Sequence, residues 1–245
     1  MSDYPVFARP PCVIQFSTKH EFFAFLRKHH VPYETWGDKE RRKIWKEVQE
    51  GDAVYCIDSS FERMPVAVRC IMPIAARIAM MHPEFGTLVL VEFVRKGDFF
   101  EPRQQMESSL SEKMLLDPAT GEPTETPAET ILRCLRQEAG VIVSEGELGE
   151  GSITFLPRTS KVLTPLPARF RVNAEGVELD FSPTTKFPGL QTYRQVAHYS
   201  VYLHHRHYWC GGHRDPDTKY YSFWRSVHEQ GIIEPIPVRL VALVT

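Results

Sequence analysis

The sequence predicts an α/β (α+β) protein with a mixed β-sheet and a small N-terminal α/β extension. Two helix patterns with clear ends occupy residues 18–51, and segments rich in Val, Ile and Leu begin near Pro65. A further helix with an apolar stripe is predicted from Thr126 to Gly140. We therefore expect an extension over residues 1–62, packed on a body over residues 63–245.

The composition is that of an ordinary globular protein, with 42% apolar and 24% charged residues. A net charge of -2 gives no global electrostatic reason to expect nucleic acid or an acidic membrane surface as a partner. The five cysteines show no C-x-x-C spacing, which favours an intracellular, reducing compartment. No apolar run approaches the roughly 18 residues of a membrane span. The cytoplasm is the default location, with an organelle such as the mitochondrion as the alternative.

The N-terminal extension is expected to begin with a short strand over Val13–Phe16. Thr18 and Glu21 have the spacing of a capping box, so a helix should start there and end near His30. A second helix is predicted over Asp38–Gln49, with Gly51 as its C-terminal stop.

This second helix is rich in basic residues, which are Lys39, Arg41, Arg42, Lys43 and Lys46. Such a series could bind RNA phosphates. Glu40 and Glu47 interleave with it, so a solvated helix face is the preferred interpretation. The expected buried stripe consists of Ile44, Trp45 and Val48.

The body contains four predicted strand regions, which are Val66–Met80, Thr87–Arg95, Val196–His204 and Val238–Val244. A turn is expected over residues 82–86, and a polar stretch over residues 96–125. Ser222–Gln230 is interpreted as a short helix that ends at Gly231.

The helix over residues 126–140 is the best-defined element. Thr126 and Glu129 form a capping-box pattern, and Gly140 suits the C-terminal end. Its apolar stripe consists of Ala128, Ile131, Leu132, Leu135 and Ala139, which we expect to pack against the sheet. Cys134 and Glu138 are four residues apart, so they should stack on one flank.

In the same region, Glu125 is followed after seven residues by a series that consists of Arg133, Leu135, Glu138, Gly140 and Val141. This spacing resembles the Nudix box, G-x5-E-x7-R-E-U-x-E-E-x-G-U, where U is a bulky aliphatic residue. The departures are Ala119 for the first Gly, Cys134 for Glu, and Gln137 for the first Glu of the pair. Residues 111–114 and 187–190 also resemble segments of a divergent Nudix-like subgroup.

The resemblance implies a Nudix-type mixed sheet sandwiched by helices, and a site for Mg²⁺-dependent cleavage of nucleoside diphosphate derivatives. Mg²⁺ prefers hard oxygen ligands, and a thiol is a poor one. Of the three helix positions that supply carboxylates in the family, only Glu138 keeps one. The resemblance therefore implies Glu138 as the metal-binding and catalytic residue if the protein is active, and no cofactor or weakly bound Mg²⁺. Glu125, Arg133 and Gln137 are the implied ligand-binding residues.

Two further patterns have alternative interpretations. Acidic residues just beyond the helix could replace the missing ligands, and these are Glu145, Glu147 and Glu150. The segment after the third strand region is rich in potential zinc ligands, namely His205, His207, Cys210 and His213, although a hydrogen-bonded surface loop is preferred. Aromatic residues concentrate near the C-terminus, where core packing is preferred over base stacking: Tyr199, Tyr202, Tyr208, Trp209, Tyr220, Tyr221, Phe223 and Trp224.

Three functions stay open on the sequence alone. The first is a Nudix-fold protein with a degraded metal motif that serves as a ligand-binding or protein-interaction module, as a subunit of a larger assembly. The second is an atypical Mg²⁺-dependent pyrophosphohydrolase with a nucleotide-like substrate. The third is an RNA-associated Nudix-like protein. The loss at Cys134 and Gln137 favours the first, the acidic residues beyond the helix favour the second, and the basic helix favours the third.

Overall fold

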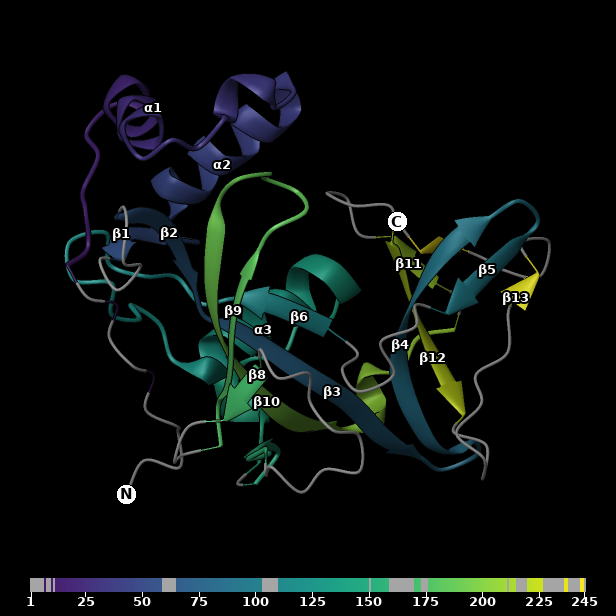
Figure 1. Cartoon of the computed structure of the whole chain (residues 1–245). Coiled ribbons are helices and arrows are strands. Elements are labelled where there is room, and N and C mark those ends of the chain that lie inside the picture. Colours follow the sequence, from purple (N-terminus) through teal and green to yellow (C-terminus); the bar gives the residue numbers. More distant parts are fainter. Residues whose placement is uncertain are drawn as a thin grey trace. The chain divides into compact units, whose positions relative to one another are not determined.

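The structure is a computed structural model, and it describes residues 7, 10, 12–58, 65–102, 110–149, 151–158, 170–172, 176–210, 212–214, 220–226, 236–237 and 243–244. These residues form a mixed α+β fold with a large mixed β-sheet and three α-helices (Figure 1). No helix in this part of the chain has the length and apolar character of a bilayer span.

The chain divides into two compact units, each built from three separate segments. Unit 1 consists of Met1–Pro73, Lys113–Thr126 and Pro157–Ala197, and unit 2 of Ile74–Glu112, Pro127–Leu156 and His198–Thr245. The boundary predicted at residue 62 falls inside unit 1, among residues outside the described part. The division into an extension and a body stays a prediction.

Unit 1 contains the two predicted N-terminal helices, α1 (Lys19–Lys28) and α2 (Asp38–Glu50). The capping box is confirmed, since Thr18 Oγ1 accepts from the Glu21 N–H and the Glu21 carboxylate accepts from the Thr18 N–H. Gly51 ends α2 with φ 78°, as a left-handed cap requires. The strand expected over residues 13–16 is reduced to one bridge.

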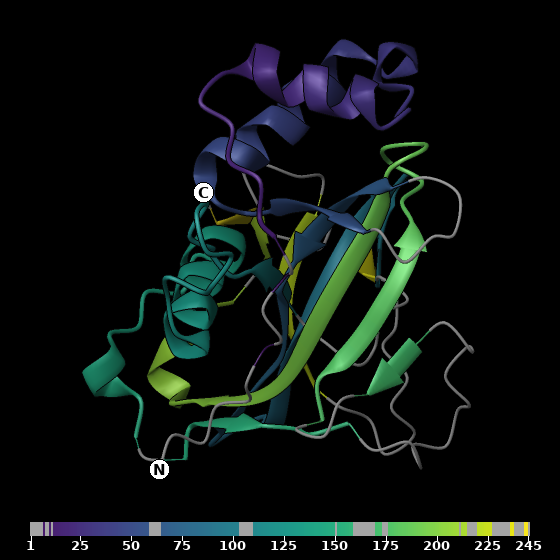
Figure 2. The ribbon, with the colours of Figure 1, turned by 60° about the vertical axis from the view of Figure 1, so that its left-hand side comes forward.

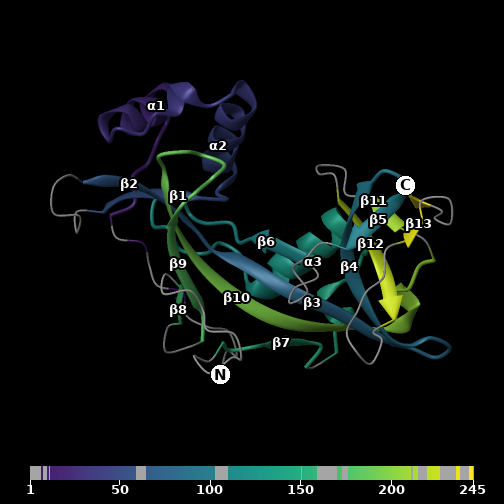
Figure 3. The ribbon, with the colours of Figure 1, turned by 45° about the vertical axis from the view of Figure 1, so that its right-hand side comes forward.

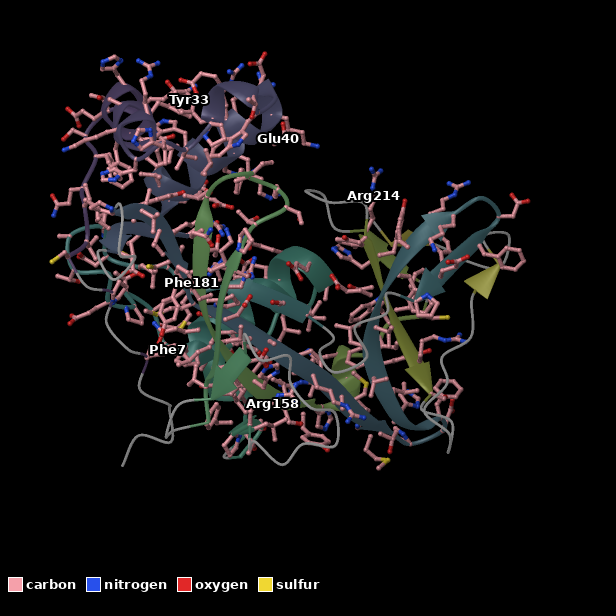
Figure 4. The ribbon with its side chains drawn as sticks, in the orientation of Figure 1. Phe7, Tyr33, Glu40, Arg158, Phe181 and Arg214 are labelled. Atoms are coloured by element: carbon pink, nitrogen blue, oxygen red, sulfur yellow. The ribbon has the colours of Figure 1, made fainter. Side chains whose placement is uncertain are left out.

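Between these helices runs the 3₁₀ helix η1 (Tyr33–Thr35). Tyr33 and Glu40 mark η1 and α2 in Figure 4.

The strands of unit 1 pair in both directions. β1 (Val54–Asp58) runs antiparallel to β2 (Val66–Ile71), and β2 runs parallel to the first part of β10 (Gln191–Leu203). On the other edge β10 pairs with β9 (Glu178–Pro183), which pairs with β8 (Phe170–Val172). Figure 2 shows β9 and β10 side by side.

One apolar core joins the helices of unit 1 to its strands and to the loop before β10. Its largest members come from all three, and they are Phe22, Leu26, Trp36, Ile44, Tyr55, Ile71, Phe187 and Leu190. The Trp36 Nε1–H donates to the Pro188 carbonyl at 3.0 Å, which fixes that loop on the helical layer.

Unit 2 is built on the antiparallel strands β3 (Pro73–His82) and β4 (Gly86–Lys96), joined at the predicted turn. β4 pairs with β12 (Tyr220–Ser226), as Figure 3 shows. The shorter strands are β5 (Phe99–Pro102), β6 (Leu110–Lys113), β7 (Ile153–Phe155), β11 (Gly212–Arg214), β13 (Ile236–Pro237) and β14 (Leu243–Val244). The last residue of β6, Lys113, already belongs to unit 1. Arg214 extends from β11 into solvent (Figure 4).

The helix predicted over residues 126–140 is confirmed as α3 (Pro127–Ala139), and Gly140 follows it with φ 65°. Four of the five stripe residues are buried, and Leu132 is half-buried. The predicted buried position of this stripe is therefore largely confirmed.

Three predictions about secondary structure need correction. The short helix expected over Ser222–Gln230 is wrong where the structure describes it, because residues up to Ser226 belong to β12. The region expected to be one long strand up to Met80 is interrupted at Met72, and the polar stretch contains β5 and β6. Of Val238–Val244, residues 243–244 form β14, and 238–242 lie outside the described residues.

Candidate functional site

The α3 flank, defined as Arg133, Cys134, Gln137 and Glu138, is positioned by the burial of the apolar stripe. Leu135 is fully buried, so the rotation of the helix about its axis is fixed. Cys134 is also buried, at 4% exposure, while Glu138 is half-buried. The Ser222 hydroxyl of β12 donates to the Glu138 carbonyl at 3.2 Å and ties the end of the helix to that strand.

The two stacked residues of the flank bond to each other. The Cys134 thiol donates to Glu138 Oε2 over 3.5 Å. Burial raises the pKa of Cys134 well above its ordinary value, and the carboxylates of Glu138, Glu112 and Glu92 raise it further. The thiol therefore stays neutral and acts as a hydrogen-bond donor. In that state it is not a ligand for a metal ion.

Arg133 forms an ion pair with Glu112 of β6, with 3.6 Å between Nη1 and Oε1. Gln137 is exposed. Glu112 and Glu92 were not predicted as site residues from the sequence, although Glu112 lies in the segment 111–114 that resembles a Nudix-like subgroup. Their approach to Cys134 depends on β6 and β4, which no local pattern reveals.

The structure gives Glu125 a local role. Glu125 belongs to unit 1, whereas the α3 flank belongs to unit 2. Its Oε1 accepts from the Leu115 N–H at 2.8 Å, and the Thr124 N–H donates to the Leu115 carbonyl. The carboxylate therefore helps to close the loop that ends before α3.

Of the acidic residues beyond α3, Glu147 is fully described. It accepts from the N–H and hydroxyl of Ser144 at 2.7 and 2.8 Å, and it pairs with Arg206 at 2.7 Å. The Ser144 N–H is the main reason that the pKa of Glu147 lies below its ordinary value, and Arg206 adds to it. The Glu145 side chain and Glu150 lie outside the described part.

The space beside the flank is narrow. The apolar gap between α3, β3 and β6 leaves no room for a water molecule. A cavity of about 250 Å³ lies instead at the C-terminal end of α3, and it is lined by Ala139, Gly140, Val141, Ile142, Arg206, His207, Tyr208, Trp209 and His213.

The His-rich segment forms the 3₁₀ helix η3 (His205–His207). His204 Nδ1 accepts from the Arg206 N–H and caps this turn. Across the described residues, no three His, Cys, Asp or Glu side chains are grouped so that they could hold a metal ion. That finding covers both the zinc ligands considered above and the surroundings of Glu138.

The C-terminal aromatic residues differ in their burial. Tyr199, Phe223 and Trp224 are buried. Phe93 and Phe223 meet edge to face at 5.1 Å, as do Trp209 and Trp224 at 5.3 Å. These rings serve in packing, as predicted, whereas Tyr202 is exposed.

The prediction of a solvated face on the basic helix α2 does not hold for Glu47. Glu47 is buried, at 4% exposure, and it points toward Arg69 of β2 and Lys113 of β6. The expected stripe is confirmed at Ile44, while Trp45 and Val48 are half-buried.

Chemically, the α3 flank offers one carboxylate that accepts a thiol hydrogen bond and one arginine that is paired with Glu112. A scan against protein-family models and a search of curated proteins each found no match to this chain.

Proposed function

We propose that this chain is a Nudix-like protein that serves as a non-catalytic ligand-binding or protein-interaction module, as a subunit of a larger assembly. The observation that carries the proposal is the hydrogen bond from the Cys134 thiol to the Glu138 carboxylate. This bond engages the one carboxylate that remains at the three metal-binding helix positions of the Nudix-like motif.

The reason is one of charge and ligand type. A diphosphate is highly anionic, and Mg²⁺ has to neutralise it and orient the reacting atoms. Mg²⁺ requires several hard oxygen ligands, but the flank supplies a buried neutral thiol, an amide and one carboxylate. Each loss of about 1.36 kcal/mol in transition-state stabilisation lowers the rate about tenfold. Efficient Mg²⁺-dependent hydrolysis is therefore not expected.

The test is a Mg²⁺ titration of the wild-type protein with a panel of nucleoside diphosphate derivatives. We expect no Mg²⁺-dependent hydrolysis above the level of Glu138→Gln, which serves as the control. Robust hydrolysis that rises with Mg²⁺ and disappears in Glu138→Gln would overturn the proposal and identify an atypical hydrolase.

A variant designed to bind Mg²⁺ tests the same proposal in the opposite direction. In Cys134→Glu/Gln137→Glu, a carboxylate enters a buried position beside Glu138, so without metal the variant should melt below the wild type. Mg²⁺ should raise its melting temperature and leave that of the wild type unchanged. Gln137→Glu alone is the matched control, because residue 137 is exposed.

A second candidate is the atypical hydrolase, and it is favoured by the carboxylates of Glu112 and Glu92, which act on Cys134 from outside the motif. The described residues do not group these carboxylates with Glu138 as a metal site, so this candidate requires Mg²⁺ and substrate to draw them together. In that case hydrolysis should be lost in Glu112→Gln as well as in Glu138→Gln. The same substrate panel distinguishes this candidate from the first.

A further inference from the structure

We propose that unit 1 carries a binding site for a terminal phosphate group, formed by Lys43 of α2 and Lys186 of the loop between β9 and β10, above a buried ion network. This site is independent of the α3 flank and of any hydrolysis.

The buried ion network consists of Glu47 and Arg69, which are buried, and of Lys113 and Asp52, which are half-buried at its edge. Glu47 Oε2 accepts from Arg69 Nε at 2.9 Å and from Nη2 at 2.7 Å, and Glu47 Oε1 accepts from Lys113 Nζ at 2.9 Å. Lys113 Nζ also donates to Asp52 Oδ2 at 3.0 Å. Both carboxylates of the network are thus engaged by Arg69 and Lys113.

The lysine pair, Lys43 and Lys186, lies on the exposed side of this network, and the two side chains are within hydrogen-bonding reach of each other. Lys43 precedes Glu47 by four residues on α2, so the two share a helix face. Lys186 is held by its neighbour Phe187, which is buried in the core of unit 1. Its Nζ lies 5.9 Å from the centre of the Phe187 ring, and Arg69 Cζ lies 5.6 Å from the same ring.

The charges at this place do not balance. Within the described residues, no ion pair joins Lys43 or Lys186 to a carboxylate. Arg69 and Lys113 offset Glu47 and Asp52, so the two ammonium groups of the lysine pair are in excess. An excess of two positive charges is neutralised by one dianion.

The pKa of Lys186 is lowered to about 8. Partial burial is the largest cause, the nearby Lys43 and Lys113 lower the pKa as well, and Glu47 opposes them. Lys43 and Glu47 face Lys186 from α2, and Lys113 faces it from β6. A bound dianion would favour the charged form of Lys186, so binding should take up a proton above pH 8.

A phosphate monoester fits this requirement better than a phosphodiester. A monoester carries a charge of about −1.5 to −2 at pH 7 because its second pKa is about 6. A diester in a nucleic-acid backbone carries one charge for each phosphate. Lysine binds phosphate as a point charge, without the planar geometry of arginine. The lysine pair therefore favours a terminal phosphate over an internal one.

The experiment measures binding by the full chain without Mg²⁺ at constant ionic strength. The probes are inorganic phosphate, a nucleoside monophosphate and an RNA oligonucleotide with a 5′-hydroxyl. We expect the two monoester-type probes to bind, and Lys43→Gln and Lys186→Gln each to weaken them about tenfold or more. Lys28→Gln, an exposed position on α1, is the matched control and should bind as the wild type does.

Lys186→Arg tests the protonation step separately. Arginine stays charged, so this variant should keep its phosphate affinity at pH 9, where the wild type loses it. Unchanged phosphate binding in both lysine-to-glutamine variants would overturn the proposal. Tighter binding of the 5′-hydroxyl RNA, lost in Lys186→Gln, would overturn the preference for a terminal phosphate and identify an RNA-binding surface.

Discussion

The α3 flank of unit 2 and the lysine pair of unit 1 differ in how their charges are compensated. In the flank, Arg133 pairs with Glu112 and Glu138 accepts from Cys134. In unit 1 the buried ions are paired, and the two lysines beside them have no carboxylate partner within the described residues. The charged side chains of the α3 flank thus have partners within unit 2. In contrast, helix α2, which was predicted to have a solvated face, carries Lys43 without a carboxylate partner among the described residues. The proposed anion site therefore lies where charge is uncompensated and not at the Nudix-like motif.

The largest expected effect tests whether the ion network beside the lysine pair stabilises the folded state. Arg69→Met leaves Glu47 buried with Lys113 as its remaining cation. Removing one partner of a buried pair costs about 3–5 kcal/mol. Chemical denaturation of the wild type and the variant measures this loss in the free energy of unfolding.

The double variant Glu47→Leu/Arg69→Met is the control for this prediction. It removes both charges together, so it should be more stable than Arg69→Met alone. A single variant that unfolds like the wild type would show that the network contributes little, and the comparison between the two regions would lose its basis.

The second effect tests the orientation of α3, which depends on the burial of Leu135. Leu135 is fully buried in α3, and truncation to Ala should lower the free energy of unfolding by about 2–5 kcal/mol. Arg136→Ala, at an exposed position one residue along, is the matched control and should change stability by less than about 0.5 kcal/mol. Equal stability of the two variants would contradict the orientation of α3 in which Leu135 is buried.

The smallest effect is a pH dependence. Burial raises the pKa of Glu47, but Arg69 and Lys113 together lower it below its ordinary value of 4.5. A lowered pKa in the folded state contributes stability that is complete above the unfolded pKa and is lost as the pH falls through the folded pKa. The stability difference between the wild type and Glu47→Gln should therefore be constant from pH 6 to 7 and shrink below about pH 4.5. A difference that grows toward acid would contradict the ion pairing of Glu47.

The helices could be predicted from the sequence because their ends are determined locally. The capping box of α1 needs only Thr18 and Glu21, and the end of α2 needs only the conformational freedom of Gly51. The stacking of Cys134 on Glu138 likewise follows from a spacing of four within one helix.

The strands near the C-terminus could not be predicted in the same way. Tyr220–Ser226 was interpreted as partly helical, but it pairs in antiparallel register with Leu88–Val94 of β4. That register joins segments far apart in the chain, and β-propensity depends on such neighbours. The aromatic and hydroxyl side chains of the segment were the available signal for a strand.

The lysine pair was hidden for a related reason. Lys43 belongs to a basic series that suggested a solvated face, and nothing in the local sequence connects it to Lys186. Glu47 was counted with the exposed charges of that face, whereas it is buried. Its burial depends on Arg69, which lies 22 residues further along the same segment of unit 1, and on Lys113, which comes from another segment of that unit.

The division of each unit into three segments has a consequence for biosynthesis. Helices α1 and α2 leave the ribosome well before the loop between β9 and β10, with Phe22 and Ile44 on the face that belongs to the core of unit 1. Phe187 and Leu190, which complete that core, are translated only after most of the intervening segments of unit 2. Domains fold as units during synthesis, and apolar surface that waits for its partner is prone to aggregation. The nascent chain should therefore depend on chaperones until residues 187–190 have emerged.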